Sequence, residues 1–414
     1  MSLGSPLTLR PVDWSDVDAQ GHNKRRKRSS DDEEQRLADQ LLGLSPKKRK
    51  RALGLPAVYY PPSLSPSEKL WRERYSFLHS KGYQLRPRYQ PGWSPTRYGN
   101  GRYHHSGEDY IMQILPQVLD AIRRQDGLVV CVKMIQDPKK VKEIQILRYF
   151  SSGHTEGNPR NHVVPFYDTF ADSFSPHLQY MVMPVLRRFD DPDFLMVGEV
   201  VDFVSQVLEG LTFLHENNIA HHNLNADHIM MDAKSIIPTG WHFVSHFCEP
   251  DGMTKITPLD RKNHSVRYYF VGFGSCYHIS PKQMPLVVDI GGTDTDVPEL
   301  STSKPYDPFK LDIYTLGNIF YKEIYLRYQN LEFLSDLIDY MRVFDFQQRP
   351  NSDKVLRVWY QTRDALDEEA IEERPLRFRE GVRPRYIYDT EAESQSPVTT
   401  RSYKRDISSI INKN

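Results

Sequence analysis

The chain has 414 residues, which is enough for one large two-lobed domain or two ordinary ones. Lys plus Arg and Asp plus Glu balance at 54 each, so the net charge indicates neither a nucleic-acid binder nor a membrane-surface protein. The three cysteines, Cys131, Cys248 and Cys276, lack a C-x-x-C spacing, which argues against a disulfide framework or a structural zinc site and favours a reducing compartment.

Residues 1–66 predict a disordered tail, because they are rich in Ser, Pro and charge and cannot bury enough surface to offset chain entropy. The chain begins with MSLGSPLTLR, which has no basic start followed by an apolar run. No window reaches the roughly 18 apolar residues that a membrane span needs. We therefore expect a soluble, intracellular protein with no membrane partner.

Two basic runs lie within this tail, Lys24–Arg28 and Lys47–Arg51. Clusters of this kind suit the acidic groove of a nuclear import receptor, the phosphates of a nucleic acid, or plain solvation as a charged tail. We expect import into the nucleus through these runs, with the cytoplasm as the alternative location. A weak contact with nucleic acid is a further interpretation.

Residues 67–107 form an extension before the main folded body. The apolar spacing of Leu70, Trp71, Tyr75 and Leu78 predicts a helix over 67–82, packed outside the main domain. The aromatic and proline-rich stretch 83–93 favours an extended segment on a surface.

A folded body is predicted from about residue 108 to about residue 366. Asp126-Gly127 marks a tight turn between two strands, because glycine supplies the positive φ that such turns require. Strands come first and helices follow, so the sequence predicts an α+β fold with a β-rich N-lobe over 108–186 and a helical C-lobe over 187–366. The predicted elements are strands over 118–124, 128–135, 163–170 and 178–185 and helices over 140–150 and 200–215, with a polar disordered tail over 367–414.

The sequence HENNIAHHNL, from His215 to Leu224, follows the long helix and resembles the H-R-D-L-x-x-x-N catalytic loop of eukaryotic protein kinases. Phrases such as IAHHNLNADHIMMD, RYYFVGFG and LRPRYQPGW are most similar to the fungal-type protein-kinase-like domains of mushroom-forming fungi. The resemblance implies a two-lobed protein-kinase fold. The other matches, in kinase order, are VCVK ending at Lys133 with Glu143 after it, GFG at 272–274, VPE at 297–299, DIYTLG at 312–317 and QRP at 348–350.

The chemistry departs from the kinase pattern. Phosphoryl transfer needs an Asp that orients the acceptor and two side chains that hold metal. The resemblance puts Asn223 at the base position and His228 and Gly272 at the two metal positions, so no catalytic residue is intact. An amide has no acid-base capacity near neutral pH, and Mg²⁺ prefers oxygen ligands. The arginine that usually follows the catalytic-loop histidine is His222 here. The sequence therefore predicts a catalytically impaired pseudokinase that does not bind Mg²⁺.

Other residues that match the family are retained. The resemblance implies a Lys133–Glu143 ion pair, Met183 as gatekeeper and Leu186 in the hinge, which together would line an ATP pocket. Whether ATP binds is left open, because Lys133 and Glu143 also serve as a purely structural pair. The remaining matches are His221, Phe273 and Leu147 in the packed spine, Asp312 under the catalytic loop, and a Glu299–Arg349 ion pair.

Residues 233–267 insert an irregular segment before the GFG motif. This insert carries Trp241, Phe243 and Phe247, so it covers the cleft, docks a protein partner or packs on the helical lobe. Asp227 and Asp232 lie near Asn223 as substitute bases, a role that we do not expect. Three functions follow: a pseudokinase that binds or scaffolds another protein, an active atypical Ser/Thr kinase, and an adaptor that contacts nucleic acid through its basic tail.

Overall fold

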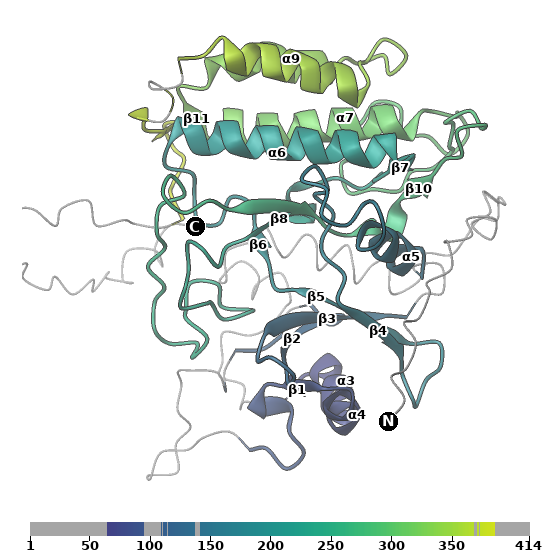
Figure 1. Cartoon of the computed structure of the whole chain (residues 1–414), viewed down its shortest axis with the longest axis vertical. Coiled ribbons are helices and arrows are strands. Elements are labelled where there is room, and N and C mark those ends of the chain that lie inside the picture. Colours follow the sequence, from purple (N-terminus) through teal and green to yellow (C-terminus); the bar gives the residue numbers. More distant parts are fainter. Residues whose placement is uncertain are drawn as a thin grey trace, which may run out of the picture.

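The computed structural model describes residues 64–385 apart from 95–108, 110, 114, 137–140, 368–370 and 372. These residues form a sheet-based N-lobe and a larger helical C-lobe, which confirms the predicted fold class (Figure 1). Nearly all of the predicted tail over 1–66, including both basic runs, and residues 386–414 lie outside the described part. Within the described ranges, none of the helices has the length and apolarity that a membrane crossing requires.

The N-lobe is a five-stranded antiparallel sheet in the order β1-β2-β3-β5-β4. The predicted hairpin is present, and Gly127 adopts a φ of 73° in its turn. Because β5 pairs directly with β3, Cys131 lies opposite Met183. The strands are β1 (Tyr83–Leu85), β2 (Val118–Arg123), β3 (Val129–Ile135), β4 (Asp168–Ala171) and β5 (Gln179–Pro184).

The strand predicted over 163–170 is shifted toward the C-terminus. Pro165 has no N–H to donate, which interrupts pairing in the first half of that stretch. Val163 makes only an isolated bridge to Phe270, and Val164 donates its N–H to the Phe270 carbonyl at 3.0 Å. Both valines are buried in the core between the lobes, so their apolar character reflects interlobe packing and not a strand of the sheet.

Helices cover both faces of the N-lobe sheet (Figure 1). Val130, Val132 and Met134 pack under α3 (Pro66–Glu73) and α4 (Tyr75–Ser80), while Cys131 and Ile135 face the core that contains α5 (Val141–Phe150). Residues 67–82, predicted as one helix packed outside the domain, are instead two short helices that share a core with the sheet. Apart from Lys133, β3 is apolar throughout, which is the signature of a strand buried on both faces.

Local contacts fix the start of α3 and the segment that follows β1. Ser65 and Glu68 form a reciprocal capping box at the helix N-terminus. Glu68 is fully buried and pairs with Arg88 at 2.9 Å. Arg88 lies in the short helix η2 (Pro87–Tyr89), so the stretch predicted as extended over 83–93 is a strand followed by a helical turn.

The C-lobe is organised around α6 and the buried central helix α7 (Figure 1). The predicted helix over 200–215 is confirmed, since α6 (Val197–Glu216) contains it. The other helices are α7 (Pro308–Ile319), the π-helical η7 (Phe320–Tyr325), η8 (Glu332–Leu334), α8 (Ser335–Met341) and α9 (Ser352–Asp364), with short turns η5 (Ala226–His228) and η6 (Phe273–Ser275). The strands are β6 (Arg187–Arg188), β8 (Ile229–Asp232) and β9 (Arg267–Phe270) in one sheet, and the pairs β7 (Ile219–Ala220) with β10 (Tyr277–His278) and β11 (Tyr328–Gln329) with β12 (Arg377–Phe378).

The insert 233–267 leaves the β8 end and approaches the N-lobe sheet on the left of Figure 1. Its two ends pack in the C-lobe core through Ile236, Ile237 and Val266. Its tip reaches the other lobe, where the His242 Nε2 lies 3.0 Å from Nη1 of Arg86. The insert thus contacts both lobes and not the helical lobe alone.

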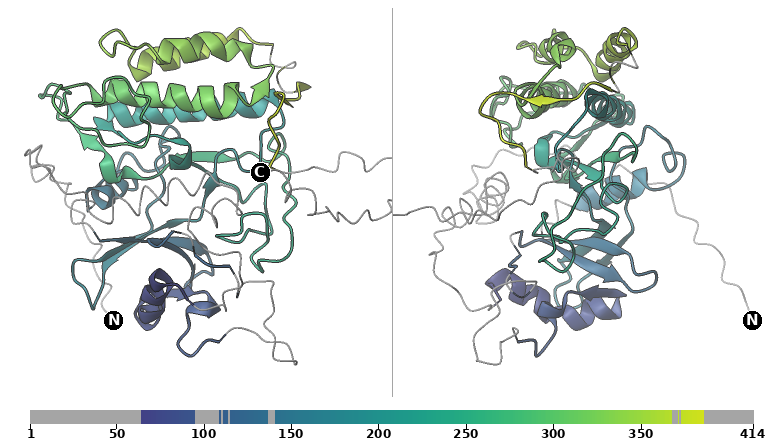
Figure 2. Two further views of the ribbon diagram at one scale, coloured as in Figure 1. Left: turned by 180° about the vertical axis from the view of Figure 1, so that it is seen from behind. Right: turned by 90° about the vertical axis from the view of Figure 1, so that its left-hand side faces the viewer.

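Residues 373–385, here called the C-terminal strap, lie against the C-lobe (Figure 2). Leu376 donates its N–H to the Leu195 carbonyl at 2.8 Å, and β12 pairs with β11. This differs from the disordered tail predicted for residues 367–414. The polar composition that motivated that prediction does not prevent these residues from adding backbone hydrogen bonds to an existing edge.

Candidate functional site

The Lys133–Glu143 pair is formed. Both Glu143 carboxylate oxygens accept from Nζ of Lys133 at 2.8 Å. β3 turns Lys133 to the face that α5 covers, and the Glu143 side chain is buried there with 2% exposure. A bidentate contact of this kind ties α5 to the sheet.

The proposed nucleotide-facing residues are tightly packed. Met183, at the end of β5, and Leu186, just after it, are each 9% exposed, and both belong to the core that joins the lobes. Cys131 is also buried, and burial raises the pKa of its thiol to about 12. The three side chains thus form a closed apolar surface beside Lys133, with the sulfur of Cys131 neutral and unreactive.

The catalytic loop is held from below by Asp312 on α7. The carboxylate of Asp312 accepts the backbone N–H groups of His221 and His222, each at 2.7 Å. The His221 ring is fully buried, donates from Nε2 to the Val271 carbonyl at 3.0 Å and lies 4.8 Å from the Phe273 ring. Burial lowers the pKa of this imidazole to about 4, so it is a neutral packing group. These contacts match the roles that the resemblance implies.

His222 occupies the place of the usual arginine and is fully buried. Its φ of 63° is a conformation that only a few non-glycine residues adopt. Nε2 donates to the hydroxyl of Tyr306 at 2.7 Å, and that hydroxyl donates to the Asp289 carbonyl at 2.9 Å. Burial lowers the pKa of His222, so its ring is uncharged at neutral pH and offers no attraction to a phosphate.

The side chain at the base position, Asn223, is held by hydrogen bonds within the chain. The Oδ1 atom of Asn223 accepts the backbone N–H of Thr293 at 3.0 Å and the Thr293 hydroxyl at 3.2 Å. Asn225 donates its side-chain N–H to the same hydroxyl at 2.8 Å. Gly292 allows this approach, since its φ is 104° and a Cβ there would lie 3.1 Å from the His222 carbonyl. The chain therefore places its own hydroxyl where a substrate hydroxyl would meet a catalytic base.

The two metal positions are also filled. Gly272 has a φ of 83°, and a Cβ on it would lie 2.7 Å from Nε2 and Cδ2 of His228. The His228 ring is fixed there because Nδ1 donates to the Asn223 carbonyl at 2.6 Å. The imidazole thus lies in the volume where a side chain at position 272 would stand. The residues present do not fit Mg²⁺, which requires oxygen ligands.

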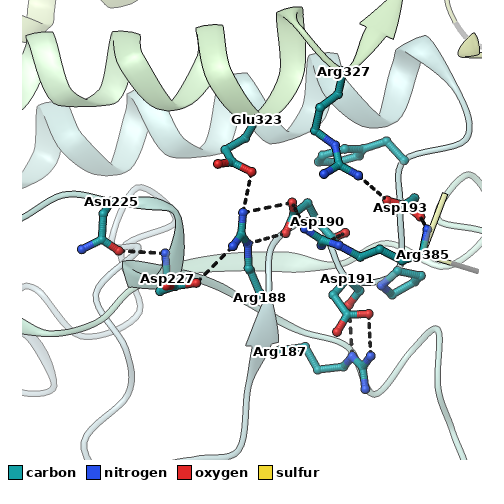
Figure 3. Close-up of polar contacts among 12 residues, drawn as sticks. Arg187, Arg188, Asp190, Asp191, Asp193, Asn225, Asp227, Glu323, Arg327 and Arg385 are labelled. Carbon is teal, nitrogen blue, oxygen red and sulfur yellow. Dashed lines mark hydrogen bonds and ion pairs between the residues drawn. The ribbon is translucent and has the colours of Figure 1, made fainter. Parts of the chain in front are cut away.

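No other described residues supply such a centre. Among the described residues, no group of three or more His, Cys, Asp or Glu side chains is arranged to hold a metal ion. Asp227, considered as a substitute base, pairs with Arg188 at 3.1 Å (Figure 3). Asp232, the other candidate, accepts the N–H of Lys234 at 3.2 Å in the turn after β8.

The helical lobe keeps its buried ion pair. Nη1 of Arg349 lies 2.5 Å from Oε1 of Glu299, and Arg349 is fully buried. This pair anchors the segment that ends at Glu299 to the C-lobe. The sequence match alone identifies both partners, whereas Thr293 carries no motif signal beyond the adjacent Gly291-Gly292.

The comparisons with known proteins agree with this geometry. The family model described as "Protein kinase domain" matches residues 115–330, about half of the chain. Serine/threonine-protein kinase PAK 1 of Mus musculus is 23% identical over 204 residues, which are 48% of this chain and 30% of that protein. Serine/threonine-protein kinase shk1/pak1 of Schizosaccharomyces pombe is 26% identical over 187 residues, 44% of this chain and 22% of the relative.

A putative serine/threonine-protein kinase, R436 of Acanthamoeba polyphaga mimivirus, is 21% identical over 183 residues, which cover 38% of this chain and 64% of the relative. The chain spans less than two thirds of the length of each of these relatives. The fungal-type branch stays a prediction, since these matches do not separate branches of the family. The fold, the motif order and the family match together show that this chain belongs to the protein kinase domain family.

Proposed function

We propose that this kinase domain is a pseudokinase of the fungal-type branch that binds or scaffolds another protein and does not transfer phosphate efficiently. The main support for the proposal is the pair of residues, His228 and Gly272, that stands at the two metal positions. The His228 ring fills the space beside Gly272, so one substitution removes a metal ligand and the other occupies its volume. The two positions are thus complementary in packing, and neither offers the oxygen ligand that Mg²⁺ prefers.

The base position supports the same function. Asn223 cannot take a proton from an attacking hydroxyl, and its oxygen is already bound by the Thr293 hydroxyl and backbone. Loss of one preorganised charge stabiliser typically lowers a rate by about 10²–10³. Effects within one catalytic unit are not additive, so the three changes do not multiply, yet each alone is large.

A second candidate is an atypical serine/threonine kinase. The Lys133–Glu143 pair favours it, because this contact is what positions the lysine of an active kinase on ATP phosphates. The named relatives are serine/threonine kinases. The same pair is also explained by its structural role in joining α5 to β3.

A phosphotransfer assay with γ-labelled ATP and Mg²⁺ separates the two. The wild-type chain is compared with the triple variant Asn223→Asp, His228→Asn, Gly272→Asp. The His228 change is needed because the ring collides with any side chain at position 272. We expect no transfer above background for the wild type and a measurable gain for the triple variant.

Lys133→Met in both backgrounds is the control for contaminating kinases. Wild-type transfer that requires both Mg²⁺ and Lys133 would reject the pseudokinase proposal. A thermal-shift titration with ATP, with and without Mg²⁺, gives an independent answer on ligand binding. We expect any ATP-induced shift to be the same with and without the metal.

A further inference from the structure

Residues 275–296 lie between the GFG and VPE motifs and are here called the activation segment. Within it, both carboxylate oxygens of Asp289 accept hydrogen bonds. Oδ2 accepts from the hydroxyl of Tyr277 and Oδ1 from the backbone N–H of Gly291, each at 2.8 Å. A Cβ on Gly291 would lie 3.0 Å from Oδ2, so glycine at this position lets the carboxylate approach closely. Asp289 thus holds the backbone turn that leads to Thr293.

Three rings connect Asp289 to the catalytic loop. Tyr277 lies on β10 and pairs with Ala220 of β7, two residues before His222. The hydroxyl of Tyr306 accepts from Nε2 of His222 at 2.7 Å and donates to the Asp289 carbonyl at 2.9 Å. The His222 ring stacks on Tyr306 with an interplanar angle of 10° and meets Tyr277 edge-on, with 4.8 Å between the centroids. The rings therefore form one packed unit against the loop.

The groups that surround Asp289 are uncharged. Burial lowers the pKa of His222, whereas burial and then the neighbouring Asp289 raise the pKa of Tyr277 and of Tyr306. Both phenols are therefore protonated at neutral pH and donate hydrogen bonds. Within the described ranges, the donors to the Asp289 carboxylate are a phenol and a backbone amide, and neither is a charged side chain. Hydrogen bonds to a carboxylate are roughly twice as strong as neutral ones, so this arrangement needs no ion pair.

The rest of the activation segment is tied down on both sides of Asp289. Val287 and Tyr306 form an antiparallel bridge, in which each donates its N–H to the other's carbonyl at 2.9 Å. On the other side, the N–H of Thr293 donates to Oδ1 of Asn223 at 3.0 Å. The chain from Val287 to Thr293 is thus held at its start, at its middle and at its end.

Kinases that are switched by phosphorylation order this segment differently. A phosphate group carries about −1.5 to −2 charges and pairs with arginine side chains. Here the uncharged His222 stands in the place of that arginine, and the segment is ordered around an unmodified carboxylate. We propose that the activation segment is kept ordered without phosphorylation by a latch, which consists of His222, Tyr277, Asp289 and Tyr306. The surface that the segment presents to a partner is then constant. This ordering does not depend on whether the domain transfers phosphate.

Hydrogen exchange followed by mass spectrometry tests the latch in the full chain after phosphatase treatment. The reporters are the hydrogen-bonded backbone amides of Val287, Gly291 and Thr293. In the wild type, peptides over 286–294 should exchange at least about tenfold more slowly than unstructured peptides of the same sequence. Exchange at the unstructured rate overturns the proposal, because the segment then needs a phosphate to become ordered.

Tyr306→Phe removes the hydroxyl that joins His222 to Asp289. Exchange over 286–294 should become at least about fivefold faster, because the buried N–H of His222 loses its acceptor. Tyr314→Phe is the matched control, since Tyr314 lies in the same small core and its hydroxyl makes no hydrogen bond within the described part of the chain. This control should change the exchange rate by less than about twofold.

Asp289→Ala removes the acceptors of Tyr277 and Gly291 and should also accelerate exchange at least about fivefold. Asp296→Ala is its control, because that carboxylate belongs to the same segment and is 61% exposed. Exchange that is equally fast in each variant and its control overturns the proposal. If a variant does not fold, as judged by circular dichroism, the phosphatase-treated wild type decides alone.

Discussion

At the level of single residues, the degenerate motifs are coupled by packing. Gly272 and His228 are far apart in the chain, yet the ring of one occupies the side-chain volume of the other. Restoring a side chain at position 272 alone therefore meets a steric barrier before its chemistry can be tested. An aspartate at position 272 needs both the removal of the ring and a φ of 83°, which is unusual for any residue with a Cβ.

This coupling can be measured with a double-mutant cycle. Gly272→Ala should lower the free energy of unfolding by about 2–4 kcal/mol, from positive-φ strain plus the contact with His228. In a His228→Ala background the steric part disappears, so Gly272→Ala should cost only about 1–2 kcal/mol. Urea unfolding of the four chains gives the interaction energy. Strict additivity of the two changes would show that the ring does not fill this space.

Buried imidazoles make the stability of the domain depend on pH. Burial lowers the pKa of His162 and of His221 to about 4, below the value of about 6.5 for an unfolded chain. Between these values the unfolded state binds more protons, so stability must fall as the pH drops below about 6.5. We expect a loss on the order of 1–2 kcal/mol per imidazole between pH 7 and pH 5.

Urea midpoints at pH 7, 6 and 5 check this. His162→Gln should make the pH dependence shallower but not abolish it, because His221 still contributes, while His177→Gln, at an exposed position, should leave it unchanged. An equally steep loss in His162→Gln would mean that other groups are responsible.

Sequence could predict residue contacts only where a motif fixes both partners. Lys133 with Glu143, and Glu299 with Arg349, were identified in this way, and both pairs are present. The contact of Thr293 with Asn223 could not be predicted, because it depends on how a long segment folds back over the catalytic loop. The placement of Arg385 is similar: its partner Asp190 lies across the lobe and no periodic pattern links them.

At the level of elements, α3 and α4 belong to the core of the N-lobe. Trp71 is fully buried, donates from Nε1 to the Pro116 carbonyl at 3.0 Å and lies 6.2 Å from the Tyr180 ring. Trp71→Ala should therefore lower the free energy of unfolding by about 3–5 kcal/mol. Trp93→Ala, at a partly exposed position, is the control and should cost clearly less. A cost below about 1 kcal/mol for Trp71→Ala would mean that these helices are only peripheral.

The predicted positions of the helices agree with the structure more closely than that of the strand predicted over 163–170, and the packing of these elements explains the difference. Apolar periodicity located α5 and α6 because a helix repeats its buried face over several turns. The stretch 163–170 is apolar for a different reason, since Val163 and Val164 fill the interlobe core before β4 begins. The helices over 67–82 were found by the same periodicity, but a single sequence does not show which face of which sheet they cover.

At the level of the whole molecule, contacts outside the kinase motifs hold the two lobes in place. The His246 carbonyl in the insert accepts from Nη1 of Arg187 at 2.8 Å, and the Trp241 ring lies 5.4 Å from the same guanidinium. Because the tip of the insert also meets Arg86, the insert spans the lobes beside the hinge. The insert therefore links the two lobes, whose relative arrangement active kinases adjust during turnover.

The net charge of the whole chain is zero, so any electrostatic attraction to a partner must come from local clusters of charge. The two basic runs, Lys24–Arg28 and Lys47–Arg51, are such clusters and lie outside the described part of the chain. We expect Lys47–Arg51 to direct nuclear import, because a compact basic run suits an acidic receptor groove while the net charge gives no general attraction. Replacing these five residues with glutamine should abolish nuclear accumulation of a tagged chain in imaging of living cells. Glutamine at Lys24–Arg28 removes the same number of charges and tests whether position or total charge matters. If neither variant changes the distribution, the chain reaches its compartment without these runs, and solvation of a charged tail is the better explanation for them.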